Sequence, residues 1–211
     1  MSSTRLYQLC GIALLIGGIL AAIGQIQNFS AASSATWVVT GLLMLTGNML
    51  EFLGLSAIPV KQAQRAGWYG LIGFLLFFLS GLLLGVAFPF LTLIMTPWMA
   101  SIPALSHSAG PPALTPVLLA IAAVNLVGTL VFATAILRAR VFPRWPAIVL
   151  IVCILLNFAG NPLGFDQLST IALAVLHLAI AWFGYILCFR STDIQETVPS
   201  PLQASQTGIG I

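Results

Sequence analysis

Six long apolar stretches divide this chain, and shorter, more polar segments separate them. Each stretch is about 20 residues long, the helical length needed to cross a hydrocarbon core of roughly 30 Å. The predicted spans are Leu6–Ile26, Thr36–Ile58, Gly67–Phe88, Pro116–Leu137, Trp145–Leu163 and Ser169–Phe189. The pattern therefore predicts an all-α membrane protein in which residues 1–190 form a six-transmembrane-helix bundle.

The basic residues all lie on one side of this predicted bundle. The chain has seven Lys and Arg residues, and each precedes the first span, follows the sixth, or lies in the second or fourth connection. They are Arg5, Lys61, Arg65, Arg138, Arg140, Arg144 and Arg190. Cytoplasmic loops of membrane proteins carry such an excess of positive charge. We therefore expect a multi-pass protein of the cell (plasma) membrane with both termini in the cytoplasm.

The composition supports a lipid-solvated surface. Hydrophobic residues make up 60% of the 211 residues and charged residues 5%, against roughly 25% charged in soluble domains. The net charge of +3 does not indicate a nucleic-acid partner, because the cations stand singly or in one group of three beside helix ends. In these positions they favour contact with anionic membrane lipid, the partner that we expect.

A proline-rich outer segment, Pro89–Pro116, lies between the third and fourth spans. It contains six of the 12 prolines and no charged residue. Proline interrupts helical hydrogen bonding, so we expect no long helix there. The apolar residues favour a position in the membrane interface or folded back over the bundle. Two interpretations stay open, a lid over a cavity and a passive cap.

The last part of the chain has a different composition. Residues 191–211 are rich in Ser, Thr, Gln, Pro and Gly, a composition that cannot bury enough apolar surface to fold. We expect a disordered cytoplasmic tail.

Four polar residues at membrane depth are the candidate ligand or proton-handling residues: Glu51, Asn48, Asn125 and His177. A carboxyl group inside a span costs roughly 2.5–3.5 kcal/mol on insertion scales, so Glu51 should face protein or water. From the helix rise, Asn48 and Asn125 match in depth to within about 4 Å, whereas Glu51 and His177 differ by about 9 Å. We therefore expect an Asn48–Asn125 contact rather than a direct Glu51–His177 pair.

Small residues form ridges on several spans and predict close helix packing. Gly47 and Gly54 flank Glu51, Gly81 and Gly85 make a G-x-x-x-G pattern, and Gly17 lies on a small-residue face of the first span. Lipid supplies no hydrophobic drive between helices, so such faces mediate close contact. Contacts inside the bundle are the favoured use, and a homo-oligomer or larger membrane complex is the alternative.

Two function classes fit these observations. The sequence has no phosphate-binding glycine loop, no H-E-x-x-H and no metal-spaced Cys/His set, so it predicts no catalytic residue, metal or cofactor. The first hypothesis is a non-catalytic accessory or lipid- or small-ligand-interacting bundle. The alternative is a small-solute or proton-linked transporter or channel that uses the polar cluster around Glu51. A polar-lined cavity that reaches Glu51 would favour the second class.

Overall fold

The computed structural model describes residues 3–30, 34–102, 114–160 and 163–189, and every element in these ranges is helical. The elements are α1 (Ser3–Ser30), α2 (Ser34–Leu55), α3 (Ala57–Leu82), the π-helix η1 (Leu83–Ala87), α4 (Phe88–Ala100), α5 (Leu114–Ala139), α6 (Arg144–Gly160) and α7 (Asp166–Phe189). The predicted all-α architecture is confirmed for these residues. The predicted tail, residues 191–211, lies outside the described ranges.

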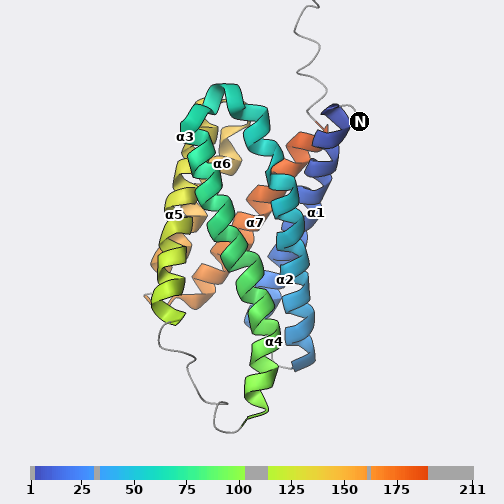
Figure 1. Ribbon diagram of the computed structural model, residues 1–211, viewed down its shortest axis with the longest axis vertical. Helices are drawn as coiled ribbons and strands as arrows, with labels where there is room; N and C mark the ends of the chain where they lie inside the picture. Colours follow the sequence, from blue (N-terminus) through green and yellow to red (C-terminus); the bar gives the residue numbers. More distant parts are fainter. Residues whose placement is uncertain (1–2, 31–33, 103–113, 161–162, 190–211) are drawn as a thin grey trace, which may run out of the picture.

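The helices pack as two groups joined by α6 (Figure 1). In the first group, α1 lies against both α2 and α7, and in the second α3 lies against α5. Glycines permit these approaches. A Cβ at Gly47 of α2 would lie 2.5 Å from the backbone nitrogen of Ala21, and one at Gly73 of α3 would lie 2.6 Å from that of Phe132. The small residues therefore serve close contacts inside the bundle.

Five helical segments are long and apolar enough to cross a membrane, within the part of the chain that the structure describes. They are Arg5–Gln27, Thr36–Leu55, Ala57–Met99, Leu114–Ala139 and Asp166–Phe189. The helix α6, in the place of the predicted fifth span, has only 17 residues, or about 26 Å at 1.5 Å per residue. The structure thus supports a multi-pass helical protein with five candidate spans.

A break at Gly67 divides the third of these segments. Gly67 has a φ of 56°, in the left-handed region that favours glycine. The residues before it, 57–66, form a short arm that arches over one end of the bundle (Figure 1). The third predicted span began at this glycine, and the residues before it were predicted to be a connection between spans. The structure shows that this connection is helical.

The proline-rich outer segment differs from its prediction. We expected no long helix there, but the first part of the segment is helical: α4 continues the third span directly after η1 and runs through Pro89 and Pro97 to Ala100. Pro89 is tolerated because it falls in the first turn of α4, where its missing N–H costs little. Phe90 and Ile94 are exposed, whereas Leu93 lies against Gly41, so α4 packs along α2 with one face and leaves the other open. Residues 103–113 lie outside the described ranges, and the lid and cap interpretations are untested there.

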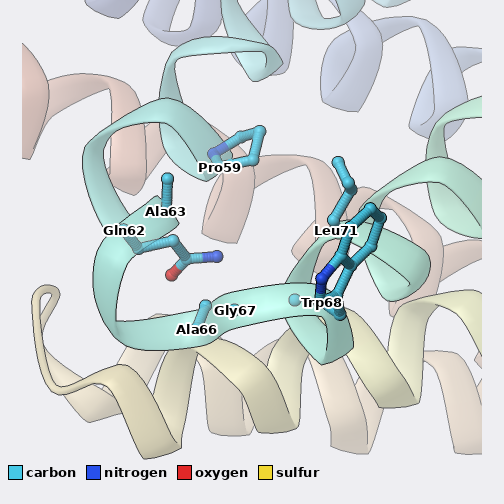
Figure 2. Close-up of a pocket in the computed structure, with 8 residues that line it drawn as sticks. Pro59, Gln62, Ala63, Ala66, Gly67, Trp68 and Leu71 are labelled. Carbon is cyan, nitrogen blue, oxygen red and sulfur yellow. The ribbon is translucent and has the colours of Figure 1, made fainter.

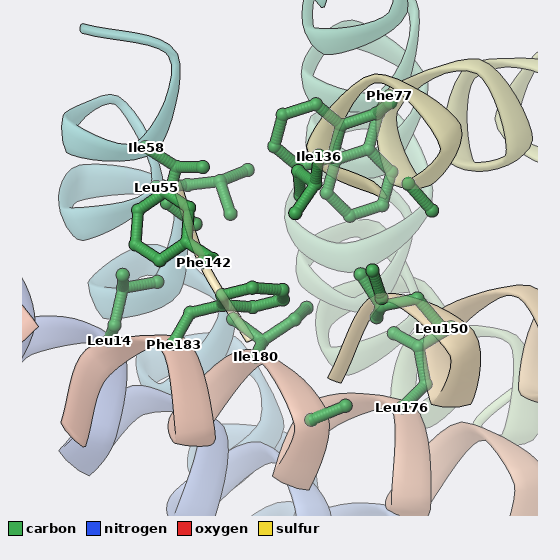
Figure 3. Close-up of a cluster of buried hydrophobic side chains, with 14 of the residues drawn as sticks. Leu14, Leu55, Ile58, Phe77, Ile136, Phe142, Leu150, Leu176, Ile180 and Phe183 are labelled. Carbon is green, nitrogen blue, oxygen red and sulfur yellow. The ribbon is translucent and has the colours of Figure 1, made fainter. Parts of the chain in front are cut away.

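An apolar core fills the bundle between the two groups (Figure 3). Its members come from α1, α2, α3, α5, α6 and α7 and include Leu14, Leu55, Ile58, Phe77, Ile136, Phe142, Leu150, Leu176, Ile180 and Phe183. Phe142 lies in the connection between Arg140 and Arg144, and Ile58 lies close in sequence to Lys61. The core therefore closes the end of the bundle that carries the basic residues.

Candidate functional site

Glu51 and His177 form a direct pair inside the bundle. The imidazole Nδ1 lies 3.0 Å from each carboxylate oxygen, Oε1 and Oε2. The Glu51 side chain is 3% exposed and that of His177 is 12% exposed. With a proton on Nδ1, the imidazole donates to the carboxylate. The expectation that these residues differ in depth by about 9 Å was therefore wrong.

Two adjacent glycines on α1 bring this pair together. A Cβ at Gly17 would lie 2.6 Å from the backbone nitrogen of Glu51, and one at Gly18 would lie 2.5 Å from the backbone carbonyl oxygen of His177. Neighbouring residues of α1 thus contact the backbones of both partners. Because α1 sets the position of α2 and α7 separately, Glu51 and His177 reach the same depth although they occupy different places along their own helices.

The predicted Asn48–Asn125 contact is not present. No hydrogen bond joins these two described side chains; Thr129 Oγ1 instead donates to Asn125, 2.7 Å from its backbone oxygen and 3.2 Å from its Oδ1. Asn48 faces η1, where a Cβ at Gly85 would lie 3.1 Å from its Oδ1. Both amides instead line one cavity together with Glu51 and His177, so the four predicted residues lie around the same cavity without the pairing expected.

That cavity has a volume of about 490 Å³ and extends from the Glu51–His177 pair toward the end of the bundle where α7 begins. Its polar lining residues are Gln25, Asn48, Glu51, Asn125, Asn157, Asp166, Ser169, Thr170 and His177. Four phenylalanines also line it: Phe52, Phe77, Phe88 and Phe158. The apolar core closes the opposite end, so the cavity is a chamber with its mouth away from the basic residues.

The sequence reasoning missed the residues at the mouth. Gln25, Asn157, Asp166, Ser169 and Thr170 lie near the ends of α1 and α6 and at the start of α7. Asn157 Nδ2 donates to Ser169 Oγ at 2.6 Å and links α6 to α7. A signal was available in the sequence, because three predicted spans carry uncharged polar residues near the same predicted membrane face, and Asp166 directly precedes the sixth span.

The cavity is acidic and aromatic. Its lining contains two carboxylates, Glu51 and Asp166, and no Lys or Arg. A carboxylate in surroundings shielded from water attracts cations strongly, and phenylalanine faces favour cations through the ring quadrupole. The lining therefore suits a positively charged, partly apolar molecule.

The π-helix η1 forms part of the wall, with Leu84 and Gly85 among the lining residues. Such π-helical turns within α-helices occur frequently at functional sites. For metal binding, Glu51 and His177 supply two potential ligands, and no cluster of three His, Cys, Asp or Glu side chains occurs within the described ranges.

Comparison with known proteins identifies no family for this chain. A scan of protein-family models, a search of curated proteins and a search of solved structures each found no match to the chain. The assignment of function therefore depends on the cavity and on the pair at its closed end.

Proposed function

We propose that the protein binds a small lipophilic cation in the central cavity and exchanges it for a proton held by the Glu51–His177 pair. The observation that carries this proposal is the chamber of about 490 Å³ that reaches the pair. A purely structural pair needs no cavity beside it. The cavity therefore favours the ligand- and proton-linked hypothesis over the accessory hypothesis.

The charge balance of the site supports a cation rather than an anion. The described basic residues belong to segments at one end of the bundle, where α1 begins, α3 bends and α5 meets α6 (Figure 1). Asp166 instead lies at the mouth of the cavity and Glu51 at its base. A cation would meet a carboxylate at both places. An anion is disfavoured, because the described lining holds two carboxylates and no Lys or Arg, and the imidazole of His177 is already paired with Glu51.

The 3.0 Å contacts between imidazole and carboxylate support the proposed proton exchange. In this proposal the empty site holds one exchangeable proton between the two groups. When a cation enters, the carboxylate pairs with it, and a protonated imidazole beside it is disfavoured by like-charge repulsion. The proton then leaves to water through the cavity, and His177 becomes neutral. The affinity for the cation should rise with pH, by up to about tenfold per unit while the pair is protonated.

Glu51→Gln tests this proposal in the purified full chain. Tetraphenylphosphonium and tetraphenylborate serve as probes, because they have nearly the same shape and opposite charge. By calorimetry, the natural protein should bind the cation in preference to the anion and release about one proton per cation bound. Glu51→Gln keeps the size of the side chain but removes its charge, so cation affinity should fall by at least about tenfold with no proton release.

Asp166→Asn provides the matched control, because Asp166 is an exposed carboxylate at the mouth. Its charge is screened by water, so its loss should change the affinity less than the loss of Glu51 does. Equal binding of the two probes, no cation binding, or unchanged proton release in Glu51→Gln would contradict the proposal. A Glu51→Gln protein that is stable and shows no binding difference would support the accessory hypothesis.

We also propose six membrane crossings with both termini in the cytoplasm, which requires α6 to cross. Its length of about 26 Å is close enough to a 30 Å core for local thinning of the bilayer. In support, α1 begins and α7 ends at the same end of the bundle (Figure 1).

Reporter fusions should test this topology. Fusions after Ile26, within residues 103–113 and at Asn161 should score external, and a fusion at the C-terminus should score cytoplasmic, because the basic residues are retained inside. The Asn161 fusion decides whether α6 crosses. A cytoplasmic Asn161 fusion together with an external C-terminus would indicate five crossings instead.

A further inference from the structure

A second pocket lies under the arch formed by the arm of α3, at the basic end of the bundle and separate from the central cavity (Figure 2). Its volume is about 280 Å³. The residues that line it are Pro59, Gln62, Ala63, Ala66, Gly67, Trp68, Gly70 and Leu71. The turn at Gly67 creates the space, because it folds the arm back toward the following helix.

Gln62 brings an unsatisfied polar group to this pocket. The residue is 1% exposed, and neither Oε1 nor Nε2 has a hydrogen-bond partner among the residues that the structure describes. The carboxamide points into the space enclosed by Pro59, Gly67 and Trp68 (Figure 2). A buried amide without partners is unfavourable in a folded protein. Here a bound molecule would supply the partners, and it must offer both an acceptor for Nε2 and a donor for Oε1.

No Lys or Arg lines the pocket itself, but the end of the bundle that holds it carries positive charge. Lys61 and Arg65 belong to the same arm, with Lys61 Nζ 5.8 Å from the ring centre of Phe142, and Arg138 lies 5.6 Å from the ring centre of Tyr69. The two described acidic residues lie elsewhere, Glu51 at the central cavity and Asp166 at its mouth. A ligand of negative charge would therefore be attracted here.

Trp68 forms an exposed aromatic wall of the pocket. Its side chain is 79% exposed although it lines the pocket. Tryptophan is enriched at the membrane–water interface, where its ring contacts the region between head group and acyl chain. Basic residues beside the membrane favour anionic lipids of the facing leaflet.

We propose that this pocket binds the head group of an anionic phospholipid that carries a free hydroxyl, as phosphatidylglycerol does. Gln62 Nε2 donates to a phosphate or ester oxygen, and Gln62 Oε1 accepts from the head-group hydroxyl. Trp68 packs against the glycerol region of the lipid, and Lys61 and Arg65 supply the surrounding positive charge. The site is independent of the cation site proposed above.

The test compares Gln62→Leu with Gln64→Leu in the full chain. Gln64 is the matched control, because it lies on the same arm, is exposed and does not line the pocket. Thermal unfolding is followed in nanodiscs of phosphatidylcholine with increasing phosphatidylglycerol. The natural protein and Gln64→Leu should be stabilised by phosphatidylglycerol. Gln62→Leu should need at least about tenfold more phosphatidylglycerol for the same rise in unfolding temperature, because it loses hydrogen bonds to a charged group.

Trp68→Ala provides a second variant in case Gln62→Leu does not fold. Trp145→Ala is its control, since Trp145 is exposed at the start of α6 and does not line the pocket. Trp68→Ala should weaken the phosphatidylglycerol effect several-fold, and Trp145→Ala should leave it unchanged. If the unfolding temperature of each variant and its control depended equally on phosphatidylglycerol, the proposal would be overturned. Water would then be the hydrogen-bond partner of Gln62. Equal stabilisation by inorganic phosphate alone would assign the site to a free anion instead.

Discussion

Gly17→Leu is expected to lower the free energy of unfolding by about 3 kcal/mol or more, the upper range for overpacking a tight interior. Even the first carbon of the new side chain would lie 2.6 Å from the Glu51 backbone nitrogen and 2.7 Å from the Gly47 carbonyl oxygen. Backbone atoms cannot rotate away, so α1 and α2 must separate. Unfolding of the purified protein in mixed micelles measures the effect.

Two further glycine variants make this result specific. Gly17→Ala should also destabilise, although alanine favours helix by about 1 kcal/mol over glycine. Gly160→Ala should be nearly neutral, because a Cβ there would meet its nearest neighbour at an ordinary 3.4 Å. If Gly17→Ala is as stable as Gly160→Ala, α1 and α2 do not pack as closely as described. A displaced α2 would also separate Glu51 from His177 and remove cation binding.

Glu51→Leu is expected to lower the free energy of unfolding by about 1–3 kcal/mol, because it leaves the His177 imidazole without a partner. The cavity admits water to the vacated position, which keeps the cost below that of a fully buried broken ion pair. His177→Leu should have a similar effect, since it leaves Glu51 unpaired in the bundle.

The double variant Glu51→Leu/His177→Leu separates pairing from packing. If the two side chains interact, it should be less destabilised than the sum of the single variants, because no unpaired polar group remains. Strict additivity of the two losses would show that the pair contributes nothing to stability. Glu51→Gln should be nearly neutral for folding, since the amide can still hydrogen bond to the imidazole.

The candidate residues could be found from the sequence, but their partners could not. Glu51 and His177 are identifiable because a polar group in an apolar span needs a protein or water partner. Their pairing depends on how far α2 and α7 are shifted along α1. One helical turn is about 5.4 Å, so the error of a span boundary alone exceeds the precision that a hydrogen bond requires.

Other features depend on contacts between segments that are far apart in the sequence. The cavity exists because polar ends of α1, α6 and α7 meet beside α2 and α5. In the sequence, Gln62 is a polar residue in a predicted connection between spans, where exposure is expected. It is buried because the chain turns back at Gly67. The prolines predicted no long helix, yet Pro89 lies in the first turn of α4, directly after the π-helical turn, where its missing N–H costs little.

The sequence by itself determined the class of the protein, an all-α bundle with several apolar helices, the polar positions within them and the small-residue faces by which they pack. These are local properties, since hydropathy over about 20 residues decides whether a helix can reside in lipid. The tertiary structure decided which polar groups meet, where a cavity remains and how the proline-rich helix continues. Those outcomes depend on the relative shift of whole helices, which is fixed by close contacts such as those at Gly17 and Gly18.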